Sequence, residues 1–354
     1  MPNETADQAM KLPIRPPFLP MEAKNVADIP TGPEWQYEPK WDGFRCLAFR
    51  DGATVELQSK AGQPLTRYFP ELVKALLNVK ARKFVLDGEI IVLVQNRLSF
   101  DDLLQRIHPA ASRVTKLANE HPAQLVLFDQ LVNDRGRSLV DRQFAQRRAA
   151  LESFVAKYMA GNPAFALSPV TQEISVARRW LKTMRGQLDG LVAKRLDLPY
   201  LSGERAMQKI KNLRTADCVV GGFRYLAKEK LVGSMLLGLY DQEGLLHHVG
   251  FTSSFEASSR PALTRKLKAL IQAPGFTGRA PGGPSRWSSE KSAEWEPLKP
   301  TLVIEVRYDH FTGHRFRHGT KFLRWRPDKS PRQCTMEQVE HEAKSPLSLL
   351  RESA

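Results

Sequence analysis

A lysine that could act as a nucleophile stands near the start of the chain. Lys40 is followed by the turn-forming pair Asp42-Gly43 and by Arg45, all within six residues. A lysine amine is unreactive while it is protonated, and neighbouring cations lower its pKa toward neutrality. The stretch therefore suits covalent chemistry, although a surface lysine beside a turn would have the same sequence.

Two later lysines could supply such cations. Lys209 and Lys211 alternate along residues 207–211, so in a strand both side chains point to one face. Two ammonium groups on one face can bind a phosphate. The simpler alternative is a solvated basic edge that discourages strand pairing.

Carboxylates interrupt two apolar runs. Asp87 and Glu89 stand inside residues 84–92, and Asp189 precedes a run that ends in Lys194-Arg195. Burying a charge is costly unless the charge is paired or binds a metal ion. A hairpin turn at Asp87-Gly88 would explain Asp87, but it explains Glu89 less well. Asp189 is a candidate ligand for a hard metal ion.

One aromatic residue and three histidines allow more than one interpretation. Phe128 ends a strand-like run and could be a core residue or a stacking platform for a base; taken alone, the core is favoured. His310, His314 and His318 recur every four residues, as metal ligands on a helix can. Gly313 and the preceding strand pattern oppose a helix there, so we predict no metal site at these histidines.

Composition favours a globular enzyme with a polyanionic partner. The chain has 354 residues, long enough for two domains, with 53 Lys and Arg against 38 Asp and Glu and a net charge of +15. Residues 213–354 contain 22 basic and 15 acidic residues, so the positive charge is spread over the chain. Nucleic acid is the leading candidate, although basic surfaces without such a partner are common.

Neither a disulfide framework nor a membrane span is expected. The three cysteines are far apart in the sequence, and their spacing matches no structural zinc site. No stretch approaches the roughly 18 uninterrupted apolar residues of a spanning helix, and the N-terminus lacks the apolar core of a signal peptide. We expect a cytoplasmic protein.

These residues must be positioned by a mixture of strands and helices. Six prolines in residues 12–33 predict an extended lead-in. Apolar runs predict strands over 84–94, 124–132 and 190–195. Periodic patterns predict helices over 69–79, 98–107, 141–159 and 172–184, the third with Asp141 as its capping residue.

The pattern changes at Asp217 to short strands separated by turns. Strands are predicted at 218–225, 233–240, 245–252 and 302–308, with one helix at 260–271, which suits a small β-barrel. We therefore predict an extended lead-in over 1–33, a first domain over 34–212 and a second over 213–354.

Six short motifs, taken in order, resemble those of covalent nucleotidyltransferases. They are KxDGxR at 40–45, DGE at 87–89, FD at 128–129, DGxVxK at 189–194, KxK at 209–211 and RPDK at 326–329. Each motif is weak alone, but the ordered set is specific and spans essentially the whole chain. It is most similar to the stand-alone bacterial ATP-dependent DNA ligases of the C type. The resemblance implies an α+β fold: an adenylation domain of antiparallel sheets with flanking helices, then an OB-fold barrel that swings about a hinge.

The resemblance also implies roles for residues around a lysyl-AMP intermediate. Lys40 would attack the α-phosphate of ATP, AMP would pass to the 5′-phosphate at a nick, and the 3′-hydroxyl would displace AMP. Glu38 would contact the adenine amino group, Arg45 would hold the nucleotide and Phe128 would stack on adenine. Glu89 would contact the ribose or a divalent metal ion, Mg²⁺ or Mn²⁺.

Further roles follow from the later motifs. Lys209 and Lys211 would bind the α-phosphate and lower the pKa of Lys40. Asp189 would bind the metal ion, although many relatives have Glu there. Lys60 stands where the family usually has Arg, which would weaken a bidentate phosphate contact.

The last motif lies in the predicted second domain. Arg326, Asp328 and Lys329 would orient the leaving pyrophosphate, which would require that domain to close over ATP. Binding of duplex phosphates by both domains would be sensitive to salt.

The expected partner is nicked duplex DNA. Because 39 residues precede Lys40, we expect no separate N-terminal DNA-binding domain, and a role in repair or end joining rather than bulk replication. A Ku-like end-binding protein could recruit the chain, which we expect to be a monomer associated with the bacterial nucleoid. Two alternatives remain: an RNA ligase or GTP-using capping enzyme with the same motifs, and a non-catalytic OB-type nucleic-acid-binding protein.

Overall fold

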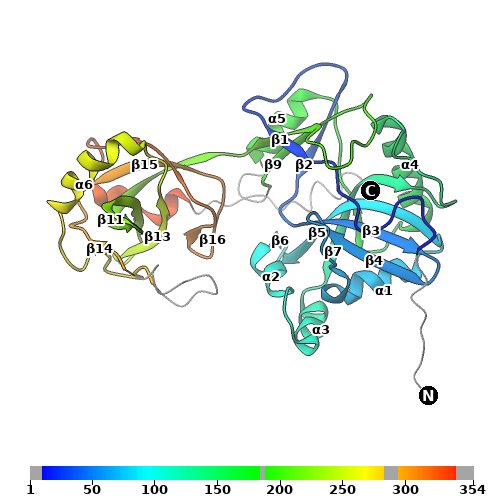
Figure 1. Ribbon diagram of the computed structural model, residues 1–354, viewed down its shortest axis with the longest axis horizontal. Helices are drawn as coiled ribbons and strands as arrows, with labels where there is room; N and C mark the ends of the chain where they lie inside the picture. Colours follow the sequence, from blue (N-terminus) through cyan, green and yellow to red (C-terminus); the bar gives the residue numbers. More distant parts are fainter. Residues whose placement is uncertain (1–9, 184–187, 283–293, 340–354) are drawn as a thin grey trace. The chain divides into compact units, whose positions relative to one another are not determined.

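The chain forms two compact units (Figure 1). The structure, a computed structural model, describes residues 10–183, 188–282 and 294–339. Within these residues, unit 1 ends at Lys211 and unit 2 begins at Asn212. Helices and mainly antiparallel strands are combined, as the α+β prediction requires. In the described ranges, no helix is long and apolar enough to cross a membrane.

Unit 1 contains two sheets. The smaller has the order β1 (Ala23–Asn25), β10 (Met207–Lys211), β9 (Gly190–Arg195), β2 (Trp35–Lys40). The larger has the order β4 (Thr54–Ser59), β3 (Phe44–Asp51), β5 (Lys83–Val94), β7 (Ala123–Val132), β8 (Phe165–Leu167), with β6 (Arg97–Leu98) paired to β5. The chain passes from the smaller sheet to the larger between Lys40 and Phe44, so the KxDG motif forms the crossing.

Helices cover these sheets and complete the cores. They are α1 (Pro70–Asn78), α2 (Phe100–Gln105), α3 (Ala111–Glu120), α4 (Phe144–Tyr158) and α5 (Ile174–Thr183). Leu72 of α1 and Leu151 of α4 are buried in the core of the larger sheet. Trp180 of α5 is buried with Tyr37 and Leu191 of the smaller sheet. Apolar burial therefore fixes one face of each sheet against its helices.

One local alternative and one local prediction are wrong. The alternative of a hairpin turn at Asp87-Gly88 is wrong, because β5, the strand predicted over 84–94, continues through this pair with a register shift against β7 and pairs with β3 on one side and β7 on the other. Glycine is needed because a Cβ at Gly88 would lie 2.6 Å from the Val126 carbonyl oxygen. Asp141 does not cap α4, which begins at Phe144 after Gln143 and has no side-chain capping hydrogen bond.

The proline-rich lead-in packs on unit 1. Met10, Leu12 and Met21 are buried in one cluster with Leu47 and Phe49 of β3. Its short strand β1 pairs in parallel with β10. These contacts bring the lead-in close to strands that carry the sequence motifs.

Unit 2 is a five-stranded barrel. Its main strands have the order β13 (Leu246–Thr252), β12 (Glu229–Tyr240), β11 (Arg214–Leu226), β15 (Val303–Tyr308), β18 (Lys321–Trp325). A parallel bridge from Thr252 to Thr320 joins the end of β13 to the start of β18 and closes the sheet. Helix α6 (Arg260–Lys268) buries Leu263 and Leu267 in the barrel core. This is the predicted OB-fold architecture.

Short elements complete unit 2. Strand β14 (Glu296–Pro297) pairs with β11, and β16 (Phe311–Thr312) pairs with β17 (Arg315–Phe316). His310, His314 and His318 lie on and beside the β16–β17 hairpin rather than on a helix. Among the residues that the structure describes, no group of three or more His, Cys, Asp or Glu side chains could hold a metal ion.

Candidate active site

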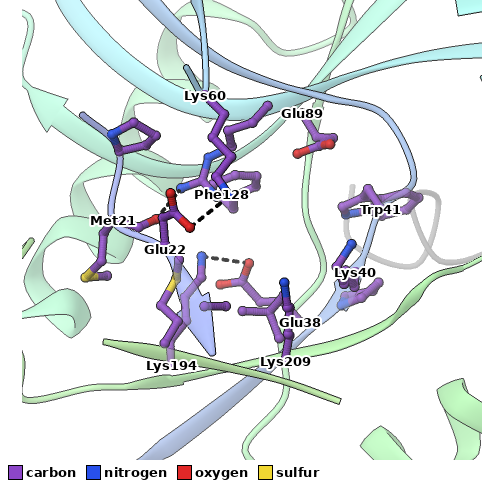
Figure 2. A pocket seen from close by; sticks show the side chains of 16 residues that line it. Met21, Glu22, Glu38, Lys40, Trp41, Lys60, Glu89, Phe128, Lys194 and Lys209 are labelled. Carbon is purple, nitrogen blue, oxygen red and sulfur yellow. Dashed lines mark hydrogen bonds and ion pairs between the residues drawn. The ribbon is translucent and has the colours of Figure 1, made fainter. Parts of the chain in front are cut away.

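A pocket in unit 1 gathers most of the residues singled out from the sequence (Figure 2). Its lining includes Glu38, Lys40, Arg45, Lys60, Glu89, Phe128 and Lys209. The lead-in contributes residues 20–23, which sequence reasoning did not place at the site. Asp189 and Lys211 are not among the lining residues, although Asp189 forms an ion pair with Lys40.

The smaller sheet forms one wall of this pocket. Glu38 of β2 pairs with Val192 of β9, which pairs with Lys209 of β10. Residues directly opposite one another share a face of a sheet, and so do residues two apart along a strand. Glu38, Lys40, Lys209 and Lys211 therefore occupy the same face, as the alternation of the two later lysines predicted.

Gly190 allows these strands to approach one another. It lies opposite both Lys40 and Lys211, with φ +143°. A Cβ at this position would lie 1.9 Å from the carbonyl oxygen of Ile210, so only glycine fits. The glycine of the DGxVxK motif thus has a backbone role next to Asp189.

The larger sheet forms the opposite wall. Arg45 of β3 pairs with Glu89 of β5, while Phe128 of β7 lies at an irregularity where the β5–β7 register shifts. Such a bulge changes the direction of a side chain. The Phe128 ring lines the pocket, 4.6 Å from the Arg45 guanidinium carbon and 4.4 Å from Lys194 Nζ.

Lys40 is stabilised in its charged form. Burial lowers its pKa, but the ion pair with Asp189, with further attraction from Glu89 and Asp42, raises the pKa above its ordinary value. The prediction that neighbouring cations lower the pKa of Lys40 is therefore wrong for this arrangement. Lys209 instead has the lowered pKa, because of burial and the charges of neighbouring lysines, Lys40 first among them.

Glu38 and Lys194 form a buried ion pair on the floor of the pocket. The Lys194 ammonium donates to Glu38 Oε2 at 2.9 Å, and the two side chains are 4% and 3% exposed. Burial lowers the pKa of Lys194 despite this pair. Lys194 ends the DGxVxK motif, so the motif carried the signal, but sequence reasoning gave this lysine no role.

Lys60 is paired with a residue that the sequence did not indicate. Its Nζ lies 2.8 Å from Glu22 Oε2, and Arg205 Nε lies 3.9 Å from the same oxygen. The hydrogen bond from Lys60 lowers the pKa of Glu22. No motif marks Glu22, because its position in the site results from the path of the lead-in.

Asp87 is explained by Arg45. The arginine donates from Nε to Oδ1 at 2.5 Å and from Nη2 to Oδ2 at 2.6 Å, and Asp87 is fully buried. A two-point ion pair of this kind fixes the guanidinium plane. The carboxylate inside the apolar run is therefore the buried partner of a pocket residue.

Two carboxylates at the pocket have the chemistry to hold a divalent metal ion that binds together with a phosphate. Glu89 and Asp189 both lie near Lys40, and burial raises the pKa of Glu89 to about 7, an effect that Lys40 and Arg45 oppose. Mg²⁺ commonly binds one or two carboxylates and completes its coordination with substrate phosphates and water. Two oxygen-donor residues fit that mode better than a site built from protein ligands alone.

In unit 2, the RPDK residues are held by a second carboxylate. Arg326 Nη1 donates to both Asp217 oxygens at 2.9 and 3.0 Å, and Arg326 Nη2 donates to Asp328 at 2.8 Å. Lys329 Nζ lies 3.3 Å from Asp217 Oδ2. Asp217 was missed from sequence, since an aspartate just before the strand predicted at 218–225 carried no further signal.

Comparison with known proteins gives matches along most of the chain. Residues 18–211 match the family model described as ATP dependent DNA ligase domain, and residues 228–329 match the model of the ATP dependent DNA ligase C terminal region. The chain is 45% identical over 347 residues to DNA ligase C2 of Mycolicibacterium smegmatis and 43% identical over 346 residues to DNA ligase C of Mycobacterium tuberculosis. Each alignment covers 94% of this chain and 96% of the relative.

A solved structure supports the fold. A structure from a study of Lig E DNA ligases, titled for DNA binding with a minimal scaffold, aligns with a TM-score of 0.53 and 17% identity. The alignment covers 87% of this chain and 99% of that chain. At this identity the likeness concerns the fold alone.

Proposed function

Because this chain belongs to the ATP-dependent DNA ligases, of the bacterial C type, we propose that Lys40 is the residue that carries AMP between ATP and DNA. Enzymes of this family seal nicks in DNA. The observation that supports Lys40 is its position in the pocket, beside two carboxylates, on the same sheet face as Lys209 and opposite the wall that carries Arg45.

The proposed reaction has three displacements at phosphorus. The unprotonated Lys40 amine attacks the α-phosphorus of ATP, a P–N bond forms, and the bond to pyrophosphate breaks. A 5′-phosphate oxygen at the nick then attacks the same phosphorus, and the P–N bond breaks. Finally the 3′-hydroxyl oxygen attacks the 5′-phosphorus, loses its proton and displaces AMP. Positioning and charge neutralisation carry most of the catalysis in such steps.

The lining residues are assigned to parts of the nucleotide. Phe128 would stack on adenine, Glu38 would accept from its amino group, and Arg45 would hold the nucleotide. Lys60 would contact a phosphate. Lys209, with Lys211 two residues further along β10, would bind the α-phosphate. The pocket lining supports these assignments for all but Lys211.

Two remaining groups complete the proposal. Glu89 and Asp189 would hold Mg²⁺ or Mn²⁺, which would neutralise charge on the phosphates. Arg326, Asp328 and Lys329 would orient the leaving pyrophosphate. The first step also requires Lys40 to lose a proton that Asp189 stabilises, so separating this ion pair is part of activation.

The proposal extends to domains and partners. Residues 34–212, with the lead-in over 1–33, would be the adenylation domain, and residues 213–354 the OB-fold domain that also binds nicked duplex DNA. We assign the enzyme to repair or end joining in the cytoplasm at the nucleoid, acting as a monomer. Sedimentation at micromolar concentration tests the monomer, and stimulation of end joining by a Ku-like protein tests recruitment.

Covalent labelling tests the central step. The protein is incubated with α-labelled ATP or GTP and Mg²⁺, denatured and examined for retained label, with Lys40→Ala alongside and the exposed Lys74→Ala as control. We expect label from ATP alone, released by nicked DNA, present in Lys74→Ala and absent in Lys40→Ala. Label retained by Lys40→Ala would reject Lys40 as the nucleophile, and label from GTP would reject the ATP specificity.

A further inference from the structure

A closed ring of hydrogen bonds lies against the pocket, and it includes a tyrosine that the proposed chemistry does not use. The Met21 backbone N–H donates to the Tyr200 hydroxyl at 3.0 Å, and this hydroxyl donates to Asp87 Oδ2 at 2.6 Å. Asp87 accepts both bonds from Arg45, and Arg45 Nη2 also donates to the Met21 carbonyl at 3.3 Å. The ring therefore begins and ends at Met21, a pocket residue of the lead-in.

The ring is shielded from water. Tyr200, Asp87 and Met21 are all buried, and the Asp87 side chain is fully inaccessible. Buried hydrogen bonds to a charged group are stronger than exposed ones, and losing one partner leaves the others unsatisfied. Each member consequently restricts the position of the next.

The Tyr200 ring is also held in place. It stacks on Phe18 of the lead-in with a centroid distance of 6.2 Å, and the Arg147 guanidinium lies 5.4 Å from its centre. Arg147 is itself bound to both oxygens of Asp129, each at 2.9 Å. The hydroxyl thus reaches Asp87 from a fixed direction.

This arrangement connects Tyr200 to nucleotide binding through Arg45. Asp87 Oδ2 is shared between Tyr200 and Arg45, so the hydroxyl helps to set the carboxylate plane and with it the guanidinium that faces Phe128. We propose that Tyr200 is a positioning residue, whose hydroxyl holds Arg45 and the Met21 segment in the geometry that receives ATP. This inference rests on the proposed role of Arg45 in holding the nucleotide.

The test removes only the hydroxyl. Tyr200→Phe retains the ring that packs on Phe18. We expect its KM for ATP in lysyl-AMP formation to rise about tenfold, the size of one lost charge-assisted hydrogen bond. The kcat should stay nearly unchanged, because Arg45 would hold the nucleotide equally in the ground state and the transition state.

Tyr158→Phe is the matched control. It also removes a hydroxyl that donates to an aspartate, in this case Asp134 at 2.8 Å. Neither Tyr158 nor Asp134 lines the pocket. Thermal unfolding of both variants is measured in the same buffer. A Tyr200→Phe enzyme that loses thermal stability but keeps its KM would overturn the proposal, since the hydroxyl would then be structural only.

Arg45→Ala separates this inference from the proposed function. If Arg45→Ala keeps the KM of the unaltered enzyme, the role of Arg45 fails, and that of Tyr200 with it. If Arg45→Ala raises KM and Tyr200→Phe does not, only the Tyr200 proposal fails. In the double variant we expect a rise in KM smaller than the product of the two single rises, and a fully additive rise would show that Tyr200 does not act through Arg45.

Discussion

Ion pairs at the pocket hold three of its lysines before a nucleotide binds. Lys40 is paired with Asp189, Lys60 with Glu22, and Lys194 with Glu38. The first two lysines are proposed to contact phosphates, so each must exchange its carboxylate for the substrate. The strength of these pairs therefore opposes ATP binding, and weakening an exposed pair should favour it.

The Glu22–Lys60 pair allows a test of this competition. Glu22→Gln should lower the KM for ATP about two- to fivefold, because more than half of the Lys60 side chain is exposed and such pairs contribute roughly 0.2–1 kcal/mol. Glu204→Gln, which removes an exposed charge from a residue whose backbone carbonyl accepts a hydrogen bond from the Glu22 N–H at 2.7 Å, serves as control. Steady-state labelling with α-labelled ATP measures both, and an unchanged or higher KM in Glu22→Gln would contradict the competition.

Strands β2, β9 and β10 set the spacing of the sheet face that carries Lys40 and Lys209, and Gly190 allows these strands to approach one another. Gly190→Ala should lower the free energy of unfolding by at least about 2 kcal/mol. The added Cβ would collide with the backbone of Ile210, and alanine would also be strained at the positive φ of this position. Gly161→Ala is the matched control, since its φ is +72° but a Cβ added there would have no atom within 4 Å. Urea unfolding compares the two variants. Equal losses of unfolding free energy would show that β9 and β10 can move apart at Gly190 at little cost.

Strand β13 carries a buried histidine that links stability to pH. Burial, together with the charges of Arg224 and Arg315, lowers the pKa of His248 from 6.5 to about 4. His248 therefore binds a proton near pH 6.5 in the unfolded state but only near pH 4 in the folded state. The stability contributed by neutral His248 is complete above pH 6.5 and is lost as the pH falls toward 4.

Unfolding at two pH values checks this linkage. Between pH 7 and pH 5 the unaltered protein should lose roughly 1–2 kcal/mol through His248, a loss that His248→Gln should not show. Urea unfolding measures the loss of unfolding free energy between the two pH values for both proteins. Subtracting the loss of the variant from that of the unaltered protein removes the contributions of the other titratable groups. A pH dependence of the same size in the variant would mean that His248 does not cause it.

At the scale of the whole molecule, residues proposed for one reaction belong to both units. Lys40 lies in unit 1, whereas Arg326, held by Asp217, lies in the OB-fold unit 2. Because pyrophosphate leaves only in the first step, the proposed role of Arg326 is confined to that step. The later steps should not depend on it.

Separate assays of the steps test this division. Arg326→Ala should slow lysyl-AMP formation about a hundredfold, the usual effect of losing one charge-stabilising donor. Sealing of a nick that already carries AMP should change less than about threefold. Arg324→Ala is the control, since this neighbour on β18 pairs with Glu305 at 2.6 Å. Equal losses in both steps would point to damage of the barrel.

The amino-acid sequence by itself determined the elements and the order of the motifs. Alternation and apolar runs are local properties, so they indicated β5, β7, β9, the helices other than α3, and the barrel strands β11, β12, β13 and β15. They did not indicate α3 or the last main barrel strand, β18. The ordered motifs then identified the DNA ligase fold and placed Lys40, Arg45 and Glu89 among the candidate residues. Where a local signal had two interpretations, as at Asp87-Gly88, the sequence could not choose between a turn and a paired strand.

Only the tertiary structure decided which side chains meet. Asp189 is 149 residues from Lys40, Lys194 is 156 from Glu38, and Tyr200 is 113 from Asp87. Such pairs depend on strand register and on the path of the lead-in, which no local pattern encodes. The raised pKa of Lys40 and the roles of Glu22 and Tyr200 follow from these distant contacts, because electrostatic and hydrogen-bond energies depend on distance in space and not along the chain.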